Sequence, residues 1–350
     1  MFANIKKSVG NSYQKISNFL KNEVWEIDLS NFSKKRAKAI KYLRVSIVTS
    51  KNFGEQNLGW KSVALSFFST MAFIPMIAIL FTVTYGFGMD KMLRTMIYEI
   101  ANNDYLVDVV TTFADNIITT AKQGPMGIIS FLVFAWVVIW LLLCVEKSFN
   151  TIWRVEKSRV IWKRILTNIL IIILSPFILI LFMFMFLTIS KGMDSIGLDI
   201  PFIESVSTII LWLIFYIFAT LLFTALYVLI PNAKVKFVPA LKSALLTALA
   251  FTIIQYLYLE TQVFVARLNA VYGVFGAIPL FMIWMNIGWY IILLGAEITY
   301  AYQHIDYYDD KSAKLLIPMS VIHEKEMNKQ LKKEHRQEKR QEKRKDKNDK

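Results

Sequence analysis

The stretch IPLFMIWMNIGWYIILLGAEITYAY, residues 278–302, decides the fold class of this chain. It has 25 residues and a single charged side chain, Glu297, close to its end. An α-helix of that length rises about 37 Å, and about 20 apolar residues are enough to cross the roughly 30 Å of hydrocarbon in a bilayer. The stretch therefore predicts a membrane-spanning helix.

Five earlier stretches have the same character, and shorter charged connections separate most of them. They are residues 63–85, 126–145, 166–189, 207–230 and 241–264. Hydrophobic residues make up 55% of the chain and the mean hydropathy is +0.45, whereas soluble domains usually contain about 45–50% apolar residues. The sequence predicts an all-α polytopic membrane protein with six transmembrane helices.

Basic residues are distributed unevenly among the predicted loops. With six spans, one side of the membrane receives residues 1–61, 146–165, 231–242 and the tail from 303, and with them 35 of the 40 Lys and Arg. Such residues accumulate in cytoplasmic loops, so we expect both termini in the cytoplasm. Contact with anionic lipid headgroups then explains the net charge of +14. We therefore expect no nucleic-acid partner.

Composition divides the chain into three parts. Residues 1–60 have apolar positions at helical spacing among many lysines, which predicts basic amphipathic helices that bind anionic phospholipid headgroups from the cytoplasm. A small cytosolic pair of helices is the alternative. Residues 61–303 form the six-helix transmembrane domain, with an outer insertion at 86–125 predicted to be an amphipathic helical hairpin. Residues 304–350 form a charged cytoplasmic tail without apolar periodicity.

Short motifs follow one another in a characteristic order. They are Phe149-Asn150-Thr-Ile-Trp153, Pro231-Asn232, Tyr272-Gly273-Val-Phe-Gly276-Ala277 and Gly295-Ala296-Glu297. In this order they resemble the YihY/virulence factor BrkB family of bacterial inner-membrane proteins, over roughly residues 60–302. The resemblance implies six spans, a location in the bacterial inner membrane and a loose association with envelope integrity. It implies no established reaction.

The sequence offers no arrangement of residues for familiar catalysis. Its three histidines fall in the last 47 residues, the spans contain no paired aspartates, and neither a phosphate-binding glycine loop nor a nucleophile motif occurs. We therefore expect a protein that is not an enzyme and that uses no metal or cofactor. The name ribonuclease BN, once given to the family, finds no support in these residues, and an enzyme acting on lipid is a minor alternative.

Polar residues on the last three spans form a candidate intramembrane pathway. Asn286 and Glu297 share one face of the sixth span, and Gly288 and Gly295 fall on the opposite face, where small residues let a neighbouring helix come close. The candidate pathway consists of Asn286, Tyr290, Glu297, Gln255, Tyr216 and Thr220.

Two functions fit this polar set. A cavity among spans four to six would move a solute or lipid, driven by a proton or sodium gradient. In a scaffold or partner-binding protein, the same side chains would only hold helices together, as when a threonine bonds the preceding turn of its own helix. The absence of a recognisable inverted repeat weakens the first function. The substrate and the oligomeric state stay open.

Overall fold

The computed structural model describes residues 24–27, 32–86, 125–155, 204–272 and 274–308, with isolated positions at 88, 91, 95, 112, 115–116, 119 and 181. Every element of secondary structure in these ranges is a helix. Four predicted features lie wholly or mostly outside the described residues: the first 23 residues of the basic stretch 1–60, the outer insertion at 86–125, the third span at 166–189 and the charged tail.

The described residues belong to two compact units, one made of residues 1–50 with 301–350 and the other of residues 51–300. The smaller unit contains α2 (Val24–Glu26), the first part of α3 (Lys34–Glu55) and η4 (Ile305–Tyr307). Arg44 donates hydrogen bonds of 2.8–3.1 Å to three carbonyls at and after α2, and its guanidinium lies 5.5 Å from the Trp25 ring centroid. One arginine thus satisfies the C-terminal carbonyls of this short helix.

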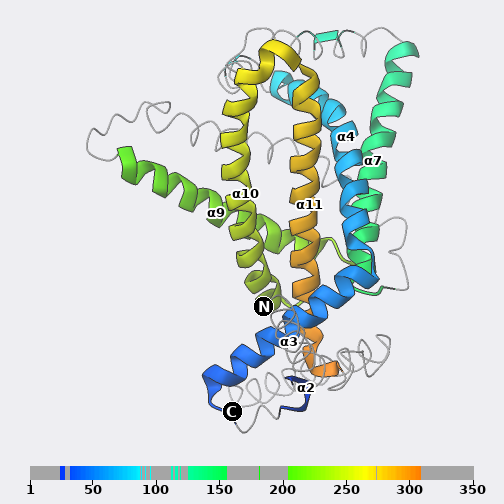
Figure 1. The fold of residues 1–350 in the computed structure, drawn as a ribbon. Helices are drawn as coiled ribbons and strands as arrows, with labels where there is room; N and C mark the ends of the chain where they lie inside the picture. Colours follow the sequence, from blue (N-terminus) through cyan, green and yellow to red (C-terminus); the bar gives the residue numbers. More distant parts are fainter. Residues whose placement is uncertain are drawn as a thin grey trace, which may run out of the picture. The chain divides into compact units, whose positions relative to one another are not determined.

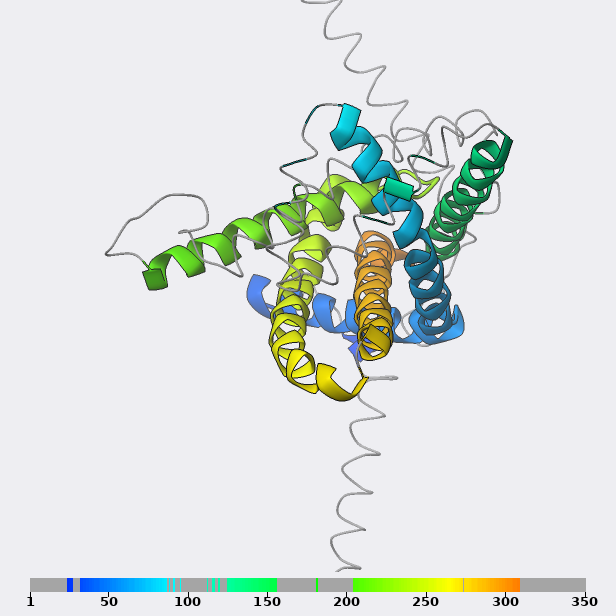
Figure 2. The same ribbon diagram turned by 90° about the horizontal axis from the view of Figure 1, so that it is seen from above.

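The larger unit is built from long helices. They are α4 (Leu58–Gly86), α7 (Pro125–Ile152), α9 (Glu204–Leu229), α10 (Phe237–Tyr272) and α11 (Val274–His304). Figures 1 and 2 show α10 and α11 side by side, with one residue between their ends. The helix α4 packs on α7, and α9 packs on α10. Both α4 and α11 continue through a proline, which membrane helices tolerate.

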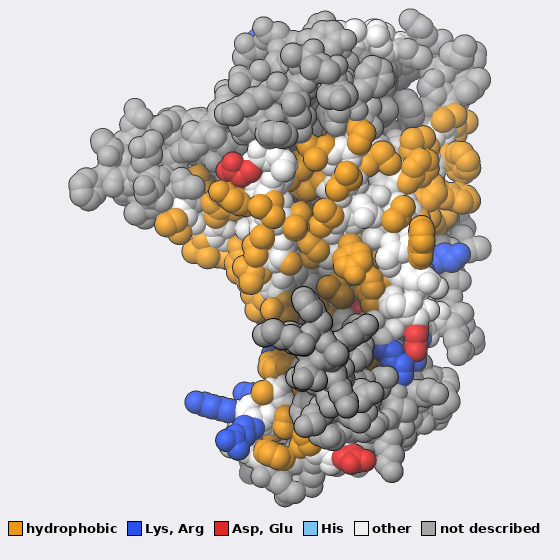
Figure 3. Space-filling model, in the orientation of Figure 1, with side chains coloured by type: hydrophobic (Ala, Val, Ile, Leu, Met, Phe, Trp, Pro, Cys, Tyr) orange, Lys and Arg blue, Asp and Glu red, His pale blue; other side chains and the backbone are white. Residues whose placement is uncertain are grey.

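Three helices are long and apolar enough to cross a membrane by length and composition: Ile209–Leu229, Phe237–Tyr258 and Pro279–Tyr307. They coincide with the predicted fourth, fifth and sixth spans. Many large apolar side chains of the larger unit are exposed, and Figure 3 shows hydrophobic side chains over a wide area of the surface. Helices with apolar side chains all round are stable in lipid, so the structure agrees with an all-α membrane protein.

Candidate functional site

The centre of the candidate site is Glu297, near the end of α11. Its side chain is 0% exposed, and its Oε1 accepts a hydrogen bond of 2.7 Å from Nδ2 of Asn52, in the last turn of α3. The second carboxyl oxygen, Oε2, is buried and has no hydrogen-bond partner among the described residues. Burying a carboxylate is costly unless both oxygens are satisfied, so Oε2 needs a proton, a water or another partner.

Asn52 connects this carboxyl group to Arg154, which follows α7. Arg154 donates from Nη2 to Oδ1 of Asn52 over 3.2 Å, and its guanidinium lies 5.6 Å from the centroid of the Tyr300 ring. Trp153 packs edge-on against the same ring. The amide of Asn52, itself 2% exposed, therefore donates to the acid and accepts from the base. One neutral side chain thus bridges an acid and a base from distant parts of the chain.

The backbone of Arg154 has an uncommon conformation. Its φ is 51°, and the amides of Arg154 and Val155 bond back to the carbonyls of Thr151 and Asn150 at 3.0 and 2.9 Å. This is the Schellman ending of a helix, whose left-handed position is usually glycine. Any other residue there costs about 1–2 kcal/mol. This conformation places the guanidinium beside Asn52 and the Tyr300 ring.

The opposite face of α11 packs closely on α9 and α10 around Gly295. Ser243 donates to the carbonyl oxygen of Gly295, and the Tyr227 hydroxyl lies 2.9 Å from Oγ1 of Thr247 and 3.1 Å from the carbonyl oxygen of Ile292. A Cβ on Gly295 would collide with the Thr247 and Tyr227 oxygens. The glycine face predicted from sequence thus lies against neighbouring helices, which fixes α11 on this side.

The polar face of α11 meets α3 and α4. Asn286 donates from Nδ2 to the Ser62 hydroxyl over 3.3 Å, and Trp289 donates from its indole to the Ser69 hydroxyl over 2.8 Å. Tyr290 is 43% exposed, and its ring centroid is 4.7 Å from that of Phe53. Two of these polar groups therefore connect helices.

The other predicted pathway residues contact different helices. Tyr216 on α9 donates its hydroxyl to the carbonyl oxygen of Leu245 over 3.2 Å, and Thr220 bonds back to the carbonyl of Tyr216 over 2.8 Å. Gln255 on α10 is 2% exposed, and its Oε1 has no hydrogen-bond partner among the described residues. In the described part of the chain, the hydrogen bonds of Tyr216 and Thr220 lead to α10 and to α9 itself and not to Glu297.

Two of the motif positions contact each other. Asn150 at the end of α7 accepts a hydrogen bond of 2.8 Å from the backbone N–H of Asn232, in the turn after α9, and Pro231 beside it is buried. The motif around the start of α11 is described in part: Tyr272 and Gly276 are helical, and Gly273 lies outside the described residues. Ala296 is 1% exposed.

Sequence reasoning missed two members of the site, Asn52 and Arg154. Asn52 stands in a basic stretch that has the pattern of an interfacial helix, and nothing in its neighbourhood marks it. Arg154 directly follows the motif that ends at Trp153, and this position next to a family motif could have identified it as a member of the site. Within the described residues no group of His, Cys, Asp and Glu is arranged to hold a metal ion.

The family model for virulence factor BrkB matches residues 49–315, which include Asn52, Arg154 and Glu297. The chain belongs to the virulence factor BrkB family. The resemblance seen in the motifs is thereby confirmed, and the match extends to both sides of the span region. No solved structure matches this BrkB-family chain significantly.

Curated relatives of this BrkB-family chain carry the name UPF0761 membrane protein. The protein from Janthinobacterium sp. (strain Marseille) is 26% identical over 266 residues, which are 74% of this chain and 59% of the relative. The one from Azotobacter vinelandii (strain DJ / ATCC BAA-1303) is 28% identical over 68% of this chain and 58% of the relative. The one from Actinobacillus pleuropneumoniae serotype 5b (strain L20) is 23% identical over 71% of this chain and 90% of the relative. The chain thus spans under two thirds of the length of the first two.

Proposed function

We propose that the protein is a proton-coupled transporter of the bacterial inner membrane in which Glu297 carries the proton. The observation that supports this most is the fully buried carboxyl group with one oxygen lacking a hydrogen-bond partner among the described residues. Ionisable groups within membrane spans are rare and usually functional. Because Oε1 is taken by Asn52, the site offers one carboxyl oxygen, which suits a proton better than a metal ion that needs several oxygens.

We further propose six spans with both termini in the cytoplasm and the division into residues 1–60, 61–303 and 304–350. The charge distribution of the loops supports the orientation. The helices α4 and α7, of 29 and 28 residues, are each long enough for a span, beside the three apolar helices already named. In this arrangement the basic stretch 1–60 meets anionic headgroups, and we propose neither a catalytic activity, a cofactor nor a nucleic-acid partner.

Proton flux tests the proposal directly. Purified protein is placed in vesicles that enclose a pH-sensitive dye, and a potassium diffusion potential set with valinomycin drives protons inward. Vesicles with the wild-type protein should acidify faster than empty vesicles, and Glu297→Gln, which keeps the shape of the side chain, should abolish the difference. Glu297→Asp should keep part of it.

A transport role is refuted if Glu297→Gln conducts protons as the wild type does, or if wild-type vesicles acidify no faster than empty ones. The protein would then be better explained as a non-transporting scaffold, and one observation favours this function. Asn286 and Trp289 both bond serines on α4, so these polar groups already have a structural role. Polar contacts of this kind stabilise membrane helix packing without any transport.

A further inference from the structure

Two lysines lie at the same end of the α4–α7 pair. Lys61 is in the first turn of α4 and is partly buried, and Lys147 is exposed near the end of α7. Neither makes an ion pair with a described residue. Burial lowers the pKa of Lys61, and the nearby charge of Lys147 lowers it further. Each lysine is two turns from the Phe68–Trp140 contact that joins the helices, so both ammonium groups lie at one end of the pair. Because neither is paired with a described acid, they form a favourable place for an anion.

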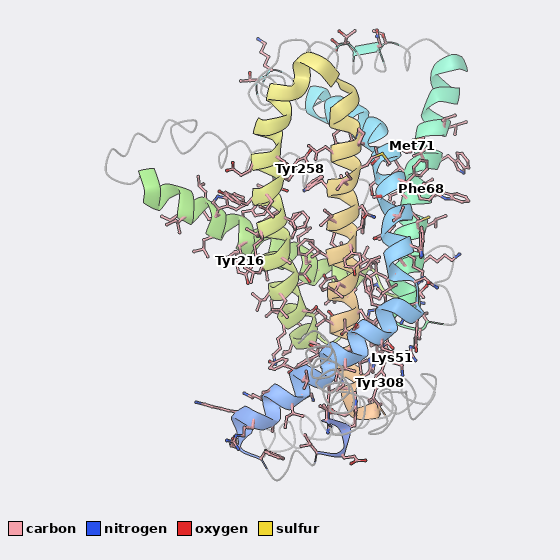
Figure 4. All side chains as sticks on the ribbon, in the orientation of Figure 1. Lys51, Phe68, Met71, Tyr216, Tyr258 and Tyr308 are labelled. Atoms are coloured by element: carbon pink, nitrogen blue, oxygen red, sulfur yellow. The ribbon has the colours of Figure 1, made fainter. Side chains whose placement is uncertain are left out.

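Exposed apolar side chains lead away from these lysines along both helices. On α4, Phe68 lies two turns from Lys61 on the same face and is partly exposed. On α7, Trp136 and Trp140 share the face of Lys147 and are about half exposed. The rings of Phe68 and Trp140 lie 6.4 Å apart, which joins the two helices, and Figure 4 labels Phe68 and Met71 on the part of α4 beside α7.

We propose that an anionic glycerophospholipid binds along this α4–α7 surface, with its phosphate between Lys61 and Lys147 and an acyl chain against the exposed apolar side chains. The charge pair recognises the phosphate, and the apolar side chains explain why a lipid fits better than a free anion. Trp60, next to Lys61 and 77% exposed, is of the type that lies at headgroup level.

Lipid retention by the full-length protein tests the site. Protein in detergent is titrated with phosphatidylglycerol or phosphatidylcholine of equal chain length, and bound lipid is counted by native mass spectrometry. We expect tight binding of phosphatidylglycerol, weakened about fivefold by Lys61→Gln or Lys147→Gln and about thirtyfold by both, since each basic residue near an anionic headgroup contributes a similar increment. Replacing both lysines by arginine should keep the binding.

The control is Lys234→Gln with Lys236→Gln, which removes the same charge from exposed positions between α9 and α10. It should leave the tight binding within about twofold, because long-range attraction alone is weak in salt. Equal weakening by the control, or equal retention of both lipids, would overturn the site. Competition by inorganic phosphate at the lipid's concentration would show a free-anion site instead. Thermal unfolding in phosphatidylcholine confirms that each variant is folded.

Discussion

Gly295 shows how a single position fixes the packing of a whole helix. Its missing side chain lets the Tyr227 and Thr247 oxygens approach the α11 backbone, and its carbonyl accepts from Ser243. Polar groups that come this close inside a membrane satisfy one another and leave no room for a methyl group. The neighbouring Gly288 is in a different situation, because a Cβ there would touch only Phe251, at an ordinary 3.5 Å.

Alanine at the two glycines should therefore have opposite effects. We expect Gly295→Ala to lower the free energy of unfolding by about 1–3 kcal/mol, because the buried side chains of Tyr227 and Thr247 must move to admit the methyl group. Gly288→Ala should be neutral or up to about 1 kcal/mol more stable, because alanine has the higher helix propensity. Unfolding in dodecyl sulfate, followed by circular dichroism, measures both. Equal stability of the two variants would contradict the close packing at Gly295.

For single residues, the sequence predicts which face of a helix a side chain lies on better than it predicts which residue that side chain contacts. The spacing of the two glycines and of Asn286 and Glu297 separates α11 into a small face and a polar face, and the contacts follow that division. The hydrogen bond from Asn52 joins residues 245 apart, which no local pattern can reveal. The half exposure of Tyr290 also depends on which helices lie beside it.

At the scale of elements, α4 presents a row of serines to its neighbours. Ser62, Ser66 and Ser69 follow helical spacing and all are buried. Two of them accept hydrogen bonds from α11, whereas Ser66 donates to the carbonyl oxygen of Val63 in its own helix. A row of small polar residues on a predicted span is typical of a helix–helix contact in membranes.

Removing single hydroxyls should separate these roles. Ser69→Ala leaves the Trp289 indole without its acceptor, and we expect a loss of about 0.6 kcal/mol, up to about 1.7. Ser66→Ala removes only a bond within α4, so its unfolding free energy should stay within about 0.5 kcal/mol of wild type. Unfolding in dodecyl sulfate measures the unfolding free energy of both variants. Comparable losses in both would mean that the interhelical bond adds nothing.

The observed helices are longer than the apolar stretches from which they were predicted. The predicted fifth span covers 241–264, whereas α10 covers Phe237–Tyr272, and α4 starts at Leu58 before the predicted 63. Hydropathy reports which residues suit hydrocarbon, but a helix can continue into the interface because its backbone bonds are internal. The existence of five of the helices was therefore predictable, and their ends were not.

At the scale of the whole molecule, charge determines orientation. Reporter fusions at Pro231 and in the tail should be cytoplasmic, and a fusion at Asp104 should be on the outer side, because 35 of 40 basic residues then lie inside. Paired alkaline phosphatase and fluorescent protein fusions measure this, since each is active on one side only. A cytoplasmic reporter at Asp104 would contradict the six-span topology.

The bridge through Asn52 also sets a condition on biosynthesis. The ribosome makes Asn52 first, Arg154 102 residues later and Glu297 245 residues after Asn52, so both polar partners exist before the acidic residue is made. Without them, the last long helix would bury a carboxyl group with neither oxygen hydrogen-bonded, at a cost of several kcal/mol. Membrane proteases that degrade incompletely inserted chains would then remove variants that lack Asn52 or Arg154. The abundance of these variants would fall before any loss of activity could be measured.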